Sequence, residues 1–103
     1  MDKKENQSKE RYQKLRLQVE AILFKHDPMG LDLEGNTDEY SPEAGTILPR
    51  LKEAKCKEDV ANIVYEEFVR WFDEDNVRDK NDPVYMAAAT EIWETHRLAS
   101  LEN

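Results

Sequence analysis

The chain has 103 residues, the usual size of one domain and too short for two ordinary hydrophobic cores. Charged residues make up 37% and hydrophobic residues 39%, which indicates an economical core with a heavily solvated exterior. With 15 Lys and Arg against 23 Asp and Glu, the net charge of −8 argues against nucleic-acid or anionic membrane surfaces as partners and favours a basic protein.

The cellular compartment is suggested by what the sequence lacks. Cys56 is the single cysteine, so the chain has no intrachain disulfide, which fits a reducing compartment. The polar N-terminus lacks the apolar run of a secretory signal, and no stretch reaches the roughly twenty apolar residues of a membrane span. We therefore expect a cytoplasmic protein.

The N-terminal part of the chain predicts one amphipathic helix. Residues 1–8 are polar, and we expect them to be frayed, with a single helical domain over residues 9–100. Apolar residues then recur at steps of three and four, as one helix face requires: Tyr12, Leu15, Val19, Ile22 and Leu23. The helix should end near His26, because Pro28 disfavours helical geometry at the preceding residue and Gly30 helps the chain to turn.

A long connection without helical periodicity follows, from Asp27 to Tyr40. Between His26 and Pro49 the chain has six acids and no Lys or Arg. Long ordered loops often carry function. We take five of these acids as candidate partner-binding residues: Asp32, Glu34, Asp38, Glu39 and Glu43. A second group would hold the loop on the domain as structural residues: Asp27, Pro28, Gly30 and Tyr40.

A second helix is predicted to start at Ser41. Its hydroxyl would cap the helix, with Pro42 at the first helical position and Glu43 facing the positive end of the dipole. The expected buried stripe consists of Ala44, Ile47, Leu48 and Leu51. Pro49 lies within this stripe and should kink the helix, because its ring and missing N–H interrupt the hydrogen bonds.

The C-terminal half predicts two more helices. The third begins near Cys56 and has the strongest periodicity, so it should form the centre of the core, with apolar residues Val60, Ile63, Val64, Phe68, Trp71 and Phe72. Asp82 and Pro83 repeat the signature of a helix start. The last helix places five residues on one face: Tyr85, Ala89, Ile92, Trp93 and His96.

These elements predict the fold class. No strand-like alternation bounded by hairpin turns occurs along the chain. We therefore predict an all-α protein, a compact four-helix, bundle-like single domain. It would have a long loop between helices 1 and 2 and a proline-kinked helix 2.

Catalytic and metal-binding motifs are weak in this sequence. The three glycines lack the spacing of a phosphate-binding loop. His26 beside Asp27 suggests an acid–base pair, but a histidine at a helix end more often interacts with the carbonyl groups there. Residues from Asp32 to Glu43 follow an EF-hand-like count, in which Thr37 stands where glycine is needed. We predict neither an enzyme nor a resident cofactor, and keep a metal-binding loop over residues 26–43 as an alternative.

Four short strings carry a resemblance: Phe24-Lys-His-Asp-Pro-Met-Gly-Leu31, Asp38-Glu-Tyr40, Glu66-Glu-Phe-Val-Arg-Trp-Phe72 and Ala89-Thr-Glu-Ile-Trp93. Together they resemble a family of small bacterial proteins, largely of unknown function, marked by an Asp-Pro-x-Gly-Leu turn and an Asp-Glu-Tyr element. That resemblance covers most of residues 12–96 and implies an all-helical intracellular domain without transferable catalytic residues. As a small acidic protein, the chain is also similar to immunity proteins of bacterial toxin systems, including contact-dependent inhibition. This similarity is one of general type and is not carried by a sequence motif.

Three hypotheses about function follow. The similarity to immunity proteins implies an acidic binding module that neutralises a basic, nuclease-like toxin by direct contact. In the second hypothesis, the chain is a stand-alone helical protein whose acidic loop is structural. The third is a metal-binding protein that uses the loop. Whether two copies form a homodimer is left open by the apolar central helix.

Overall fold

Helices make up most of the computed structural model, which describes residues 2–28 and 40–101, with side chains over 9–28 and 40–99. The α-helices are α1 (Asp2–His26), α2 (Ser41–Ile47), α3 (Lys57–Phe72) and α4 (Pro83–Leu101), and the 3-10 helices are η2 (Leu48–Glu53) and η3 (Glu74–Asn76). No strand occurs in the described ranges, so the predicted fold class, an all-α single domain, is confirmed. Within the same ranges, no helix combines the length and the apolar character that crossing a membrane requires.

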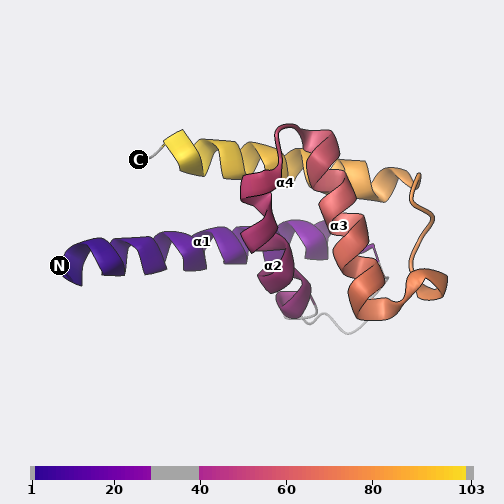
Figure 1. Ribbon diagram of the computed structural model, residues 1–103, viewed down its shortest axis with the longest axis horizontal. Helices are drawn as coiled ribbons and strands as arrows, with labels where there is room; N and C mark the ends of the chain where they lie inside the picture. The colour runs from indigo at the N-terminus through magenta and orange to yellow at the C-terminus, as the bar shows by residue number, and fades with distance from the viewer. Residues whose placement is uncertain (1, 29–39, 102–103) are drawn as a thin grey trace.

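The four α-helices form two antiparallel pairs (Figure 1). α1 and α4 run side by side in opposite directions along the long axis of the molecule, so the two termini lie at the same end. α2 and α3 cross this first pair steeply; α3 packs mainly on α4, and α2 packs on α1 and α3. This arrangement differs from the aligned helices of a simple bundle. With only seven residues, α2 can cover no more than a short length of α1.

α1 begins earlier than predicted. Its backbone is helical from Asp2, so residues 2–8, which we expected to be frayed, continue the helix. The polar residues of this stretch include Lys, Glu and Gln, which favour helical backbone even where no apolar face guides the chain. The helix ends at His26, as predicted.

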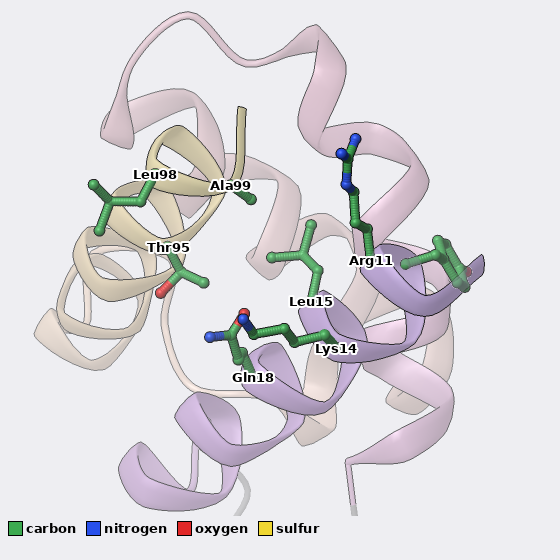
Figure 2. Close-up of a pocket in the computed structure, with 8 residues that line it drawn as sticks. Arg11, Lys14, Leu15, Gln18, Thr95, Leu98 and Ala99 are labelled. Atoms are coloured by element: carbon green, nitrogen blue, oxygen red, sulfur yellow. The ribbon is translucent and has the colours of Figure 1, made fainter. Parts of the chain in front are cut away.

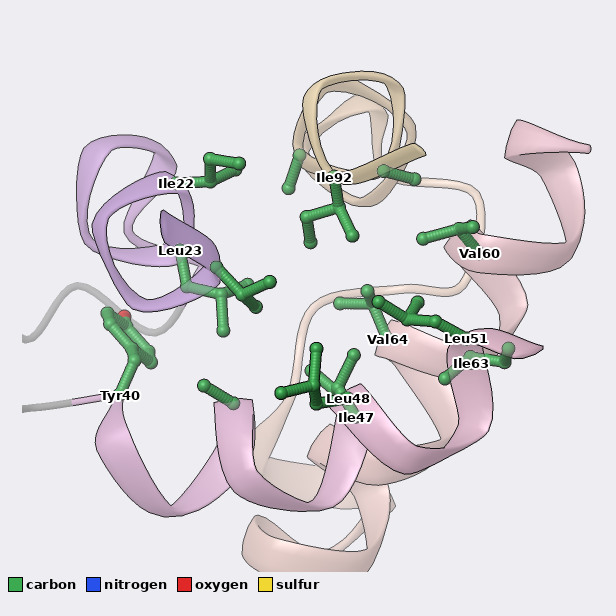
Figure 3. Packing of buried hydrophobic residues seen from close by; sticks show 14 of the residues in the cluster. Ile22, Leu23, Tyr40, Ile47, Leu48, Leu51, Val60, Ile63, Val64 and Ile92 are labelled. Carbon is green, nitrogen blue, oxygen red and sulfur yellow. The ribbon is translucent and has the colours of Figure 1, made fainter. Parts of the chain in front are cut away.

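The core draws on one face of each helix (Figure 3). Its buried apolar residues are Val19, Ile22, Leu23, Tyr40, Ala44, Ile47, Leu48, Leu51, Val60, Ile63, Val64, Phe68, Tyr85, Ala88, Ala89 and Ile92. Tyr65, which lies off the main stripe of α3, packs against this cluster and meets the Tyr85 ring edge to face at 5.4 Å. Trp71 was predicted to be buried but is 46% exposed. It lies at the surface with its indole N–H donating to the Thr46 hydroxyl at 3.0 Å.

The second predicted helix changes geometry after Ile47. α2 ends there, and the 3-10 helix η2, which contains Pro49, continues the chain. The prediction that Ser41 caps α2 was wrong, because the helix already includes Ser41 and Tyr40 holds the cap position without a side-chain hydrogen bond. The Ser41 hydroxyl instead accepts a hydrogen bond from Arg16 of α1 at 3.2 Å.

The predicted start of α4 is confirmed. Pro83 is its first residue. The Asp82 carboxylate accepts a hydrogen bond from the Val84 N–H at 2.9 Å, and the Asp82 carbonyl accepts one from the Tyr85 N–H at 3.3 Å. Asp82 thus satisfies two of the amides that an α-helix leaves unpaired at its N-terminus.

A buried carboxylate fastens η2 to α3. The Glu67 side chain is almost fully buried, and Arg50 donates to its Oε2 at 3.0 Å and to Glu66 Oε1 at 2.8 Å. The hydrogen bond to Glu66 raises the pKa of the Arg50 guanidinium above its ordinary value. Because a buried charge is costly without a partner, this ion pair favours one orientation of η2 on α3.

Candidate functional site

A hydrogen bond joins the two residues that flank the acidic segment 29–39. The backbone of Asp27 turns out of α1 with a φ of 47°, and its N–H donates to the Leu23 carbonyl at 2.7 Å. The Tyr40 hydroxyl donates to Asp27 Oδ1 at 2.6 Å. Tyr40 is fully buried, and its ring stacks on Phe68 of α3 with 5.8 Å between centroids. We call this contact the Asp27–Tyr40 lock.

The segment that follows α3 is fastened beside the lock. The Asn76 side-chain amide donates to the Phe72 carbonyl at 2.7 Å, which closes the end of α3. Arg78 Nε donates to the Pro28 carbonyl at 2.8 Å, and the Arg78 carbonyl accepts from the buried Tyr85 hydroxyl at 2.8 Å. Arg78 therefore ties the connection from α3 to α4 to the end of α1, and Figure 1 shows this connection at the opposite end of the molecule from the termini.

Four exposed carboxylates cluster in this segment, and we call them the acidic end: Asp73, Glu74, Asp75 and Asp79. Asp79 accepts a hydrogen bond from the Asn81 N–H at 3.0 Å. None of the four takes part in an ion pair within the described residues. The first three directly follow the C-terminus of α3, where the helix dipole is negative and carboxylates are unfavourable. The acidic end therefore holds charge available to a cationic partner, at some cost in stability.

The backbone at this end of the molecule is strained at two aspartates. Asp73 has a φ of 73° and a ψ of 148°, and Asp27 has a φ of 47°. They are the two non-glycine residues with positive φ in the described part of the chain. Asp tolerates such geometry better than most residues, but a residue in a sparsely populated region costs on the order of 1–3 kcal/mol. Strain and unpaired charge thus coincide at one end of the protein.

The sequence-predicted site residues are only partly covered by the structure. Asp27, Pro28 and Tyr40 are brought together around the lock. Four predicted partner-binding residues and one structural residue lie outside the described residues: Asp32, Glu34, Asp38, Glu39 and Gly30. Glu43 is described, and the expectation that it forms an exposed contact was wrong, because its side chain lies on the core-facing side of α2 and is only 3% exposed.

Sequence reasoning missed the acidic end. Three consecutive acids directly after the apolar pattern of α3 were a usable signal. The link between this connection and the end of α1 could not be predicted, because it depends on the hydrogen bond between Arg78 and Pro28, which are fifty residues apart in sequence. A local pattern contains no information on that contact.

His26, which lies beside Asp27 in the sequence, contacts another helix. His26 Nε2 lies 2.5 Å from Glu91 Oε2 of α4, and Lys25 Nζ lies 3.1 Å from the same oxygen. The hydrogen bond with His26, followed by that with Lys25, lowers the pKa of Glu91 below its ordinary value. The histidine and Lys25 therefore help to join the C-terminal end of α1 to α4.

Metal-binding groups among the described residues and similarity to known proteins do not indicate a function for this site. The described residues contain no group of three or more His, Cys, Asp or Glu side chains that could hold a metal ion. The EF-hand-like count falls almost entirely outside the described residues, and its last member, Glu43, is buried. No model of a known family, no curated protein and no solved structure matches the chain.

Proposed function

We propose that the chain is an acidic protein-binding module that engages a basic partner. The binding surface would combine the acidic end with the carboxylates of the segment between α1 and α2. The observation that supports this proposal is the hydrogen bond from Arg78 to Pro28 at 2.8 Å. Arg78 belongs to the same connection as the exposed carboxylates of residues 73–79, and it donates to the residue at which the acidic segment leaves α1. We therefore propose that the two acidic stretches of the sequence act on one partner.

The particular role that we propose is that of an immunity protein in the bacterial cytoplasm, which neutralises a cognate nuclease-like toxin by direct binding. A nuclease needs a basic surface to hold the phosphate backbone of its substrate. Carboxylates without ion-pair partners complement such a surface, speed association and compete with the substrate for the same cations. The net charge of −8 and the similarity in type to immunity proteins agree with this role.

The Asp27–Tyr40 lock would support binding by limiting the freedom of the acidic segment. Holding a loop at both ends lowers the entropy that is lost when it is ordered on a partner. We also propose that residues 29–39 form the predicted long connection, and that Pro49 bends the second helical segment where α2 gives way to η2.

The test of the toxin hypothesis measures association with the toxin-like product of the neighbouring gene. Glu74→Lys with Asp75→Lys should slow association about tenfold or more at low salt, because these residues carry exposed charge toward the partner. Glu53→Lys, an exposed acid at the end of η2, is the matched control and should have a much smaller effect. Stopped-flow fluorescence at several salt concentrations gives the rates.

Two results would contradict the proposal. The first is the absence of a complex with the toxin-like protein, together with a failure of the chain to protect cells that express it. The second is a complex whose association rate is insensitive to salt and to the reversal of Glu74 and Asp75, since steering by exposed charges weakens as ionic strength rises.

A structural role for the acidic segment is the second candidate, and the lock favours it. In that case Asp38→Ala should lower thermal stability without changing association with a partner. If Asp38→Ala instead weakens association and leaves the melting temperature unchanged, the segment is a binding element. Differential scanning calorimetry and the same rate measurement separate the two.

A further inference from the structure

A groove of about 280 Å³ lies between α1 and the last turns of α4 (Figure 2). These parts of the two helices lie at the end of the molecule that carries the termini (Figure 1). Arg16 of α1 hydrogen-bonds to Ser41, where α2 begins, so the part of α1 before Arg16 extends beyond the short α2. The volume is slightly below the range of roughly 300–1,000 Å³ typical of small-molecule pockets. A groove between two helices fits the side of another helix.

The floor of the groove is apolar. Leu15 is half-buried, whereas Tyr12 is 43% exposed and Leu98 is 52% exposed. Figure 2 shows Leu15 pointing from α1 toward the α4 side, where Leu98 and Ala99 lie. In the same view Leu98 points away from Leu15, so it lies at the rim of the groove. Exposed apolar side chains along a concave surface are typical of sites that bind another protein.

The charge of the groove is opposite to that of the whole protein. The chain has a net charge of −8, yet the described residues that line the groove include Arg11 and Lys14 and no carboxylate. In Figure 2 these two cations lie on opposite sides of Leu15. Lys14 takes part in no ion pair within the described residues. An apolar strip flanked by cations is complementary to an apolar strip flanked by carboxylates.

We propose that this groove binds an acidic amphipathic helix of a partner protein. Apolar residues of the partner at helical spacing would contact Leu15 and Leu98, while its Asp and Glu side chains would pair with Lys14. A second copy of the chain is a poorer occupant, because a symmetric contact would bring Lys14 and Arg11 close to the same cations of the copy. The site is separate from the acidic end and does not depend on the toxin hypothesis.

The test selects helical peptides from a displayed library on the full chain. We expect the enriched sequences to combine Leu, Met or Phe at helical spacing with flanking Asp and Glu. The most enriched peptide, labelled with fluorescein, then gives a Kd from fluorescence anisotropy. Lys14→Glu and Leu98→Ser should each weaken binding about tenfold or more, because they change the charge of the groove and an apolar residue that lines it.

Two matched controls lie outside the groove. Leu17→Ser removes an apolar residue of α1 that is 62% exposed and does not line the groove, and Lys52→Glu reverses an exposed cation of η2. Each should change the Kd less than about twofold, since neither residue lines the groove in which the partner helix would lie. Circular dichroism shows whether every variant keeps its helix content.

The outcomes separate this site from the acidic end and from self-association. Binding that weakens with salt and with Lys14→Glu, but not with Glu74→Lys, supports the groove. Enriched peptides without acidic residues, or an equal Kd for Lys14→Glu and Lys52→Glu, overturn the proposal. It is also overturned if analytical ultracentrifugation finds a dimer that Leu98→Ser dissociates while no peptide binds.

Discussion

Replacing Asp73 with glycine should stabilise the protein. Asp73 ends α3 with a φ of 73° and a ψ of 148°, close to a region of backbone geometry that glycine alone enters readily. Its side chain is exposed and caps neither α3 nor η3. Its N–H donates to Val69 at 2.8 Å and its carbonyl accepts from Asn76 at 3.0 Å, and both bonds need only the backbone. The substitution therefore relieves strain and removes no structural contact.

Three terms set the size of the effect at Asp73. Relief of the strain gains on the order of 1–3 kcal/mol. The greater freedom of glycine in the unfolded chain costs about 0.5–1 kcal/mol, and removal of a carboxylate from the negative end of α3 gains about 0.3–1 kcal/mol at low salt. A net gain of about 1.5 kcal/mol follows, which corresponds to a rise of roughly 6–12 °C in Tm for a domain of this size.

Urea and thermal unfolding, followed by circular dichroism, measure the effect against three controls. Asp73→Asn removes the charge and keeps a side chain that tolerates positive φ, whereas Asp73→Ala removes the charge and keeps the strain. Asp75→Gly removes the same charge from η3, where φ is not positive, and should leave stability nearly unchanged, because the charge that is removed and the freedom that glycine adds have opposite effects of similar size. The free energy of unfolding should fall in the order Gly, Asn, Ala at position 73. A glycine variant no more stable than the alanine variant would refute the reasoning.

Three further changes test the lock, the core and an ion pair. Tyr40→Phe should lower the free energy of unfolding in urea by about 1.5–3 kcal/mol, because the buried hydroxyl donates to the Asp27 carboxylate at 2.6 Å; an unchanged midpoint would contradict this. Phe68→Ala should cost about 3–5 kcal/mol, since this fully buried ring stacks on Tyr40, and a much smaller loss would mean that the core collapses around it. The hydrogen bond with His26 holds the pKa of Glu91 below its ordinary value of 4.5, so its stabilisation is present above that pH and is lost as pH falls through the lowered pKa. Glu91→Gln should therefore be less stable than the wild type near neutral pH and equally stable at strongly acidic pH, and a pH-independent difference would argue against the pair.

The helices could be predicted because their signals are local. The effect of Pro28 on the end of α1, and the cap and proline at the start of α4, act within a few residues of the backbone that they shape. The apolar spacing of α3 also predicted its buried face through Val60, Val64 and Phe68. Helical periodicity depends only on which residues of one helix share a face. The sequence of that helix is therefore sufficient to predict its buried face.

The contacts between helices could not be predicted in the same way. Ser41 has the chemistry of a helix cap, but Arg16 of α1 lies within reach of its hydroxyl. Trp71 follows the apolar pattern of α3, but the pattern does not show that in the last turn Phe72 packs against the core while Trp71 lies at the surface. Glu43 looked like a surface acid, although the side of α2 on which it lies faces the core. In each case the decisive neighbour belongs to another helix.

The acidic end combines features that selection for stability alone would tend to remove. Asp73 and Asp27 both have positive φ, and Asp73 is the first of three consecutive carboxylates at the negative end of α3. Arg78 of the same connection donates to Pro28, the residue after Asp27. Local rules of stability are most often broken where a surface serves another purpose. Asp73→Gly tests this directly, because a variant that is more stable but associates more slowly with a basic partner would show that stability is given up for binding. If association is unchanged, the strain reflects only the path that the chain takes from α3 to α4.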